Sequence, residues 1–178
     1  MAKALIVVDM QNDFVSGVLG SKEAQATVPN VVRKIQKYYD QHADIVCTLD
    51  THDYNYLNTP EGKKLPVPHC IRNTEGWLIC PQIVNTQVPF LAINKETFGY
   101  PYWDSYLGDD LSSIELVGVC TDICVVSNAL ILKALYPETE IIVDASCCAG
   151  TTPEAHQAAL RVMQSCQITV IGETLCTE

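Results

Sequence analysis

The sequence of 178 residues is poor in positive charge, with 11 lysines and arginines against 21 aspartates and glutamates. The formal net charge at pH 7 is −10, and no basic run interrupts the chain. A surface that neutralises phosphate groups is difficult to build from so few cations. We therefore expect no nucleic acid partner.

Long apolar runs are also missing. No stretch approaches the ~20 residues that a membrane-spanning helix needs, so we expect no membrane contact. The chain opens with Met-Ala-Lys-Ala-Leu and passes directly into a strand pattern, without the layout of a signal peptide. The expected location is the cytoplasm.

The nine cysteines include no pair spaced as Cys-x-x-Cys. A zinc ribbon or a thioredoxin-like site is therefore unsupported. The number of cysteines is odd, and most of them lie within apolar segments. These two observations predict reduced thiols rather than a disulfide framework.

What the sequence does contain is an alternation of apolar runs and helical patterns. Length and composition fit one α/β domain over residues 1–178. The alternation predicts a single-domain, Rossmann-like fold with a mainly parallel sheet of about six strands and helices on both faces. Strands are expected at 4–8, 43–49, 88–94, 113–119, 140–144 and 168–171. Helices are expected at 29–39, 100–107, 124–135 and 152–165, with Pro29 opening the first and a polar loop at 15–26.

The stretch 116–126 reads as a buried strand that turns into a helix. This turn puts Cys124 where backbone N–H groups converge and the helix dipole favours a thiolate. The same N–H groups can hold a developing oxyanion. Cys124 is therefore the candidate nucleophile, although a free cysteine in such a place is more often a buried core residue.

Polar side chains follow four of the predicted strands. Because the carboxyl ends of parallel strands share one edge of a sheet, these side chains are expected to converge. Asp9 can take the proton of the Cys124 thiol and return it to a leaving amine. Lys95 favours the thiolate and the developing negative charge. Asp50 and His52 follow the second predicted strand, at 43–49.

The chain resembles the isochorismatase-like cysteine hydrolases from about residue 3 to about residue 171. Two motifs carry the resemblance: Asp-x-Gln-Asn-Asp-Phe at 9–14 and Gly-Val-x-Thr-Asp-x-Cys-Val at 118–125, with a strand that ends in lysine between them. The resemblance implies a catalytic triad of Asp9, Lys95 and Cys124.

The resemblance also implies the geometry around the nucleophile. In this family a cis peptide bond precedes the residue at Cys120, which is the Val119–Cys120 bond here. The backbone N–H groups of Cys120 and Cys124 are then expected to form the oxyanion hole.

Nicotinamidases of this family bind a divalent metal through Asp-x-His and further His or Glu residues. Some have a middle histidine, but that position is Asn58 here. The chain therefore resembles the variant with glutamate. Zn²⁺ is the predicted metal, while Fe²⁺ and Mn²⁺ suit the same donors. The implied metal ligands are Asp50, His52, Glu61 and His69.

Glu61 and His69 lie in a long irregular segment, residues 53–88, of a length that is usually functional in a compact domain. Nicotinamidases usually place an aromatic residue shortly before the final histidine, but Leu-Pro-Val-Pro occupies that place here. The substrate pocket is therefore expected to use other aromatic residues, all of which fit a core role equally well. The predicted pocket residues are Phe14, Phe98 and Tyr100, with Trp77 and Trp103 as further candidates.

The leading hypothesis is hydrolysis of the carboxamide of nicotinamide to nicotinate and ammonia, by an enzyme whose partner is a small-molecule amide. The resemblance also implies a homo-oligomer. One alternative is a metal-free cysteine hydrolase of another small amide or ureide. Another is a non-enzymatic, thiol-based redox protein, for which the adjacent Cys147 and Cys148 are the motive. Hydrolysis of isochorismate without a cysteine nucleophile is disfavoured because Cys124 is present.

Overall fold

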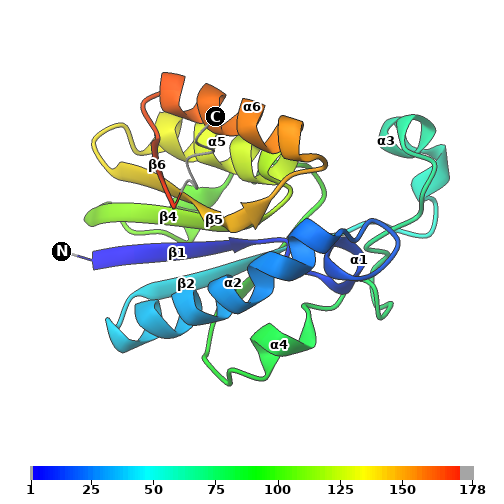
Figure 1. Cartoon of the computed structure of the whole chain (residues 1–178), viewed down its shortest axis with the longest axis horizontal. Helices are drawn as coiled ribbons and strands as arrows, with labels where there is room; N and C mark the ends of the chain where they lie inside the picture. Colours follow the sequence, from blue (N-terminus) through cyan, green and yellow to red (C-terminus); the bar gives the residue numbers. More distant parts are fainter. Residues whose placement is uncertain (1, 173–178) are drawn as a thin grey trace.

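Six strands form one sheet in the order β3-β2-β1-β4-β5-β6, and every neighbouring pair is parallel. The structure is a computed structural model that describes residues 2–172 (Figure 1). The predicted fold class, a parallel sheet with helices on both faces, is confirmed. The strands are β1 (Ala2–Val8), β2 (Asp44–Asp50), β3 (Leu91–Lys95), β4 (Leu111–Val119), β5 (Glu140–Ala149) and β6 (Thr169–Ile171).

Helices cover both faces of the sheet (Figure 1). The helices α1, α2 and α4 lie on one face, whereas α5 and α6 lie on the other. Short helical turns occupy the connections. The helices and turns are α1 (Asn12–Val15), α2 (Lys22–Asp40), η1 (Tyr56–Asn58), α3 (Pro60–Lys64), α4 (Pro81–Val84), η2 (Trp103–Ser105), η3 (Thr121–Val125), α5 (Val126–Leu135) and α6 (Pro153–Ser165).

Strand β1 shows why the chain makes a sheet buried on both sides. Its residues alternate between two cores, since Ile6 and Val8 pack under α5 and α6, whereas Leu5 and Val7 pack under α2. A continuous apolar run is what such a strand requires. Chain order moves outward from β1 to β3 and then returns to β4, so the topological switch lies between β1 and β4, where open α/β sheets bind ligands.

Helix α2 begins well before its expected start, so the predicted polar loop at 15–26 and helix start at Pro29 were wrong. The Ser21 hydroxyl caps the helix by accepting a hydrogen bond from the N–H of Ala24 at 2.9 Å. Pro29 lies inside the helix and is exposed, as is Gln25, whose carbonyl loses its usual partner. The helix keeps Pro29 because the unpaired carbonyl belongs to an exposed residue.

Three boundaries in the second half also differ from expectation. Strand β3 starts at Leu91 rather than at residue 88, and the segment 100–107 contains only the 3₁₀ turn η2. Strand β5 continues to Ala149, so Cys147 and Cys148 are buried strand residues. The eight described cysteines are free, and Cys176 lies outside the described residues. Among residues 2–172, no helix is long and apolar enough to cross a membrane.

Candidate active site

Asp9 stands directly after β1, at the switch point of the sheet. Its backbone is left-handed, with φ of 48°, a conformation that is uncommon outside glycine and frequent at functional sites. The backbone N–H of Asp9 donates to the carbonyl of Thr48 at 3.2 Å, and its carbonyl accepts from Gln11 at 2.7 Å. The hydroxyl of Thr48 donates to Oδ1 of Asp9 at 2.6 Å. The carboxylate is therefore fully buried and fixed.

The neighbouring strand β4 approaches β1 very closely just before the cysteine turn. Gly118 has a φ of +116°, and a Cβ at this position would lie 2.1 Å from the carbonyl oxygen of Val8. Only glycine fits this contact and this backbone conformation. The Val119–Cys120 peptide bond that follows is cis, as the resemblance implies. Asp9 and the cysteine turn are thereby placed side by side.

Lys95 joins the strand ends. Its Nζ lies 2.7 Å from Oδ2 of Asp9, 3.4 Å from Oδ1 of Asp50 and 3.5 Å from Sγ of Cys124. The side chain of Lys95 is fully buried, and Cys124 is buried in the turn η3. The structure thus brings together the three residues predicted as a triad.

Burial dominates the protonation of this group. Burial raises the pKa of the Asp9 carboxyl. Burial also raises the pKa of the Cys124 thiol, and the nearby charge of Asp9 raises it too. Burial opposes the charge of Lys95, but Asp9, Cys124 and Asp50 outweigh that effect and raise the pKa of Lys95. The resting group therefore contains a neutral thiol, a cationic lysine and a carboxyl group of increased basicity.

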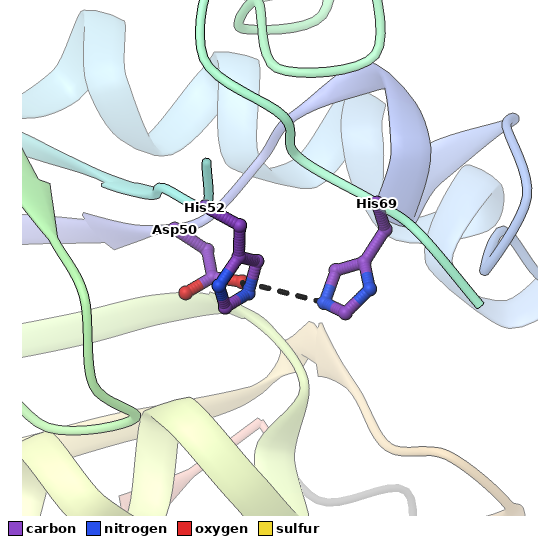
Figure 2. A group of neighbouring side chains, drawn as sticks. All are labelled: Asp50, His52 and His69. Carbon is purple, nitrogen blue, oxygen red and sulfur yellow. Dashed lines mark hydrogen bonds and ion pairs between the residues drawn. The ribbon is translucent and has the colours of Figure 1, made fainter. Parts of the chain in front are cut away.

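The predicted metal ligands lie beside this group. One donor atom each from Asp50, His52 and His69 lies within 4.8 Å of the others, and Figure 2 shows His69 reaching toward Asp50 and His52 from another segment. Nε2 of His52 is 3.0 Å, and Nε2 of His69 is 3.5 Å, from Oδ2 of Asp50. Oε1 of Glu61 lies 3.6 Å from Nε2 of His52 and 3.9 Å from Nε2 of His69. All four predicted ligands therefore converge.

His69 is positioned from behind. Its Nδ1 donates to the carbonyl of Val67 at 2.8 Å, which leaves Nε2 to face Asp50. The next residue, Cys70, accepts a hydrogen bond from the N–H of His52 at 3.0 Å and donates its N–H to Oδ2 of Asp13 at 2.8 Å. The long segment 53–88 is thus attached to the end of β2 at the histidine.

The donor set suits a divalent cation. Burial acts to raise the pKa of Asp50, but hydrogen bonds from His52 and His69 and the charge of Lys95 lower it well below its ordinary value. One ionised carboxylate and two imidazoles, with a second carboxylate nearby, form a ligand set that Zn²⁺, Fe²⁺ or Mn²⁺ accepts.

A cavity of about 700 Å³ opens over both groups. Asp50, Glu61 and His69 line one part, and Cys120 and Cys124 line another. Much of the remaining lining is apolar and includes Phe14 and Phe98, two of the three residues expected in a substrate pocket. The other lining residues include Leu19, Ala24, Val119, Ile123 and Ala149.

Tyr100 is not among the residues that line this cavity in the described part of the chain. Its ring packs instead against Trp103, at 5.3 Å between ring centroids, and against neighbouring tyrosines. Its backbone N–H is held by Oδ1 of Asn128 at 2.8 Å. Tyr100 was expected as an aromatic wall of the pocket, but these contacts hold it outside the cavity lining. Trp103 is fully buried in the core.

Sequence reasoning missed the residues that hold the site in place. The side chain of Gln11 accepts from the N–H of Asp50 at 2.7 Å and donates to the carbonyl of Asp50 at 2.9 Å. The ring of Tyr56 packs against the rings of His52 and His69, at 4.6 and 5.0 Å between centroids. Gln11 belongs to the sequence motif at 9–14, but the motif alone does not predict that its side chain holds the backbone of Asp50.

A parallel α/β sheet that carries a cysteine, a lysine and an aspartate at one edge is typical of a class of cysteine hydrolases. The chain belongs to the isochorismatase domain family, which it matches over residues 3–174. The family predicted from the motifs is confirmed.

Named relatives share this fold and length. The nicotinamidase of Schizosaccharomyces pombe is 26% identical, and the alignment covers 96% of this chain and 93% of that protein. The pyrazinamidase/nicotinamidase structure from Streptococcus mutans is 29% identical, with a TM-score of 0.83 over 96% of this chain and all of that one. The zinc complex of the pyrazinamidase of Pyrococcus horikoshii is 28% identical, with a TM-score of 0.78 over 97% of this chain and all of that one. These names agree with the predicted class of enzyme, an amidase.

Proposed function

We propose that the protein is an amidase that hydrolyses nicotinamide to nicotinate and ammonia, with Cys124 as the nucleophile. One observation supports this function above all others. Lys95 connects Asp9 and Cys124 to Asp50, so a thiol with an acid–base partner lies beside a candidate metal site under one cavity. The names of the relatives point to the same substrate class.

The residues that would hold the metal are Asp50, His52, His69 and Glu61, because their donor atoms converge. These residues would thereby provide a Lewis acid for a pyridine nitrogen, and the ring would be oriented by that contact. A structure of the Pyrococcus horikoshii relative contains zinc, which supports Zn²⁺ as the metal.

Acylation follows from the positions of the protein's own groups. Asp9 accepts the proton of the Cys124 thiol, and the sulfur attacks the carboxamide carbon. The charge of Lys95 stabilises the thiolate at 3.5 Å. The backbone N–H groups of Cys120 and Cys124 donate to the developing oxyanion. Asp9 then returns its proton to the departing ammonia, and a thioester remains on Cys124.

Deacylation uses the same base. Asp9 takes a proton from a water molecule, whose oxygen attacks the thioester carbon. The carbon–sulfur bond breaks, and Asp9 returns its proton to the sulfur, which regenerates the thiol of Cys124. The nicotinic acid leaves and loses its proton to solvent as nicotinate. The apolar lining around Phe14 and Phe98 suits the faces of an aromatic ring.

The test is ammonia release from nicotinamide by the purified protein, measured as isolated, after chelation and after Zn²⁺, Fe²⁺ or Mn²⁺ is added back. We expect release that chelation lowers by at least about a hundredfold and metal restores.

Two other outcomes would change the proposal. Release that persists after complete removal of metal would favour the metal-free hydrolase. No release from nicotinamide with any of the three metals would reject this substrate.

A further inference from the structure

The turn that carries the nucleophile is itself unusual. Residues Thr121–Val125 form one π-helical turn, in which the carbonyl of Cys120 accepts hydrogen bonds from the N–H groups of Ile123 and Val125, both at 3.1 Å. Turns of this kind are rare and frequently lie at functional sites. No side chain caps the start of this turn. Groups outside the turn must therefore fix its orientation.

One such group comes from α6. The side chain of Thr121 is completely buried, and its Oγ1 lies 2.8 Å from Nδ1 of His156. Thr121 stands directly after Cys120 and three residues before Cys124. His156 is in the first turn of α6, where its N–H donates to the carbonyl of Thr152 at 2.9 Å. This contact ties the first residue of η3 to the first turn of α6.

A second tie uses the next residue. Oδ1 of Asp122 accepts the N–H of Thr151 at 2.8 Å, and Oδ2 of Asp122 accepts the hydroxyl of Thr151 at 2.5 Å. A Cβ at Gly150 would lie 2.8 Å from Oδ1 of Asp122 and 2.9 Å from Cβ of His156, so the three segments are in close contact. The term α6 clamp denotes the four residues of these two contacts, Thr121, Asp122, Thr151 and His156.

We propose that Thr121 and His156 are positioning residues, which act through the turn by aiming the N–H groups of Cys120 and Cys124 at the substrate oxyanion. This inference rests on the proposed function, because it assigns the oxyanion hole to that turn. Neither side chain is expected to touch the substrate. Oxyanion contacts act in the transition state, so the clamp should affect kcat and leave KM nearly unchanged.

Thr121 offers a matched pair of variants. Thr121→Val keeps the shape of the side chain and removes the hydroxyl, whereas Thr121→Ser keeps the hydroxyl. In the metal-loaded enzyme we expect Thr121→Val to lower kcat for nicotinamide by at least about tenfold, with KM within about twofold. Thr121→Ser should stay within about threefold of the parent. The exposed Gln157, next to His156 on α6, serves as the control position through Gln157→Ala.

His156 gives an independent test, which also covers the case that Thr121→Val does not fold. His156→Ala should lower kcat as Thr121→Val does, while His156→Asn, which keeps a polar group near Nδ1, should recover part of the loss. The double variant should lose no more than the worse single variant, because both remove the same contact. Full additivity, or equal activity of the alanine and asparagine variants, would overturn the pairing.

Two chemical probes separate the clamp from the choice of substrate. Acylation by 4-nitrophenyl acetate joins sulfur to the acetyl carbon and releases 4-nitrophenolate, so it needs an oxyanion hole but no recognition of nicotinamide. Alkylation of Cys124 by iodoacetamide passes through no oxyanion. We expect Thr121→Val to slow acylation at least about tenfold and to change alkylation by less than about twofold. Cys124→Ala measures the background from other thiols.

Each outcome decides between the proposals. If the parent ignores nicotinamide but acylation follows the clamp, the substrate is wrong and the clamp stands. If Thr121→Val acylates at the parent rate, or slows acylation and alkylation equally, the clamp is rejected. A parent enzyme whose acylation does not exceed that of Cys124→Ala would reject both the nucleophile and the clamp.

Discussion

Within residues 2–172, two groups place one lysine between two carboxylates, and one of these groups belongs to the candidate site. The site group consists of Asp9, Asp50 and Lys95 at the carboxyl edge of the sheet. The structural group consists of Lys34, Glu115 and Asp144, between α2 and strands β4 and β5. The balance of charge is the same in both groups, so the difference must lie in their contacts.

The structural group is closed. Lys34 contacts Glu115 at 2.5 Å and Asp144 at 2.6 Å. The hydroxyl of Tyr38 donates to the second oxygen of Glu115 at 2.5 Å, and the N–H and hydroxyl of Ser146 donate to the second oxygen of Asp144 at 3.0 and 2.6 Å. None of these residues lines the cavity over the candidate site in the described part of the chain. The contacts of the structural group hold α2 on the sheet, and each of its carboxylates is bound on both oxygens.

The site group is open. Lys95 has one short contact, at 2.7 Å with Asp9, and its other two contacts, with Asp50 and Cys124, are 3.4 and 3.5 Å long. One partner is a thiol, and both Asp50 and Cys124 line the cavity. The comparison teaches that buried charge alone does not mark a candidate site. The site group differs from the structural group in its contact with a nucleophilic thiol and in its access from a cavity.

The largest expected effect comes from the nucleophile. Cys124→Ala should lower ammonia release from nicotinamide by at least about 10⁴-fold, because no other group replaces the sulfur. Cys148→Ala is the matched control, since Cys148 is equally buried but belongs to the core of β5. Its activity should stay within about threefold of the parent. Equal losses in both variants would mean that packing, not nucleophilicity, explains the effect.

The next effect distinguishes the two groups by their carboxylates. Asp9→Asn removes the proton acceptor and should lower kcat by about 10³-fold, within the range for general acid–base catalysis. Asp144→Asn makes the same change in the structural group and should leave kcat within about threefold. The measurement is steady-state kinetics of both variants at saturating metal. If Asp144→Asn lost as much activity as Asp9→Asn, the two groups would not differ in the way proposed.

For the free energy of unfolding, we expect a large effect from the structural group. Lys34→Met leaves Glu115 and Asp144 without their cation, and breaking a buried ion pair costs about 3 kcal/mol of unfolding free energy. The side chain of Lys34 is only 12% exposed, so water replaces little of the lost contact. Urea unfolding would measure this change. An unfolding free energy equal to that of the parent would show that the structural group does not stabilise the fold.

The smallest effect is the dependence of stability on pH. Burial acts to raise the pKa of Asp144, but hydrogen bonds from Lys34 and Ser146 outweigh it and lower the pKa below the ordinary 3.8. A lowered folded-state pKa adds stability above the unfolded pKa of about 3.9, and this stability is lost as pH falls through the folded value. The difference in unfolding free energy between parent and Asp144→Asn should therefore shrink below about pH 4. A difference that grows in acid would contradict the assigned direction.

Much of the fold was predictable because apolar runs and caps are local signals. The runs at 4–8 and 113–119 formed strands at the expected places, and Thr152 caps α6 through the N–H of Ala155 at 3.1 Å. Helix α2 was harder, because Pro29 usually marks a first turn and here stands on the exposed side of a helix. The helix starts instead at the Ser21 cap, ahead of the buried residues Ala24, Thr27 and Val28.

The chemistry of the site was easier to predict than its walls. Asp9, Lys95 and Cys124 follow apolar strands, so the rule for parallel sheets brings them together without knowledge of the loops. The pocket position of Tyr100 was not predictable in the same way. The direction of a loop side chain depends on tertiary contacts, here with Asn128 and Trp103. The clamp between Thr121 and His156 joins residues 35 positions apart, and no local pattern predicts such a contact.

The most direct test of the central claim, that Cys124 is the nucleophile, uses the unmodified, metal-loaded enzyme. Iodoacetamide is added in a time course, and ammonia release is compared with the alkylation of Cys124 and of the exposed Cys166, both followed by peptide mass spectrometry. We predict that activity falls at the rate at which Cys124 is alkylated, that nicotinamide slows both equally, and that alkylation of Cys166 has no effect. Full activity after complete alkylation of Cys124 would contradict the claim.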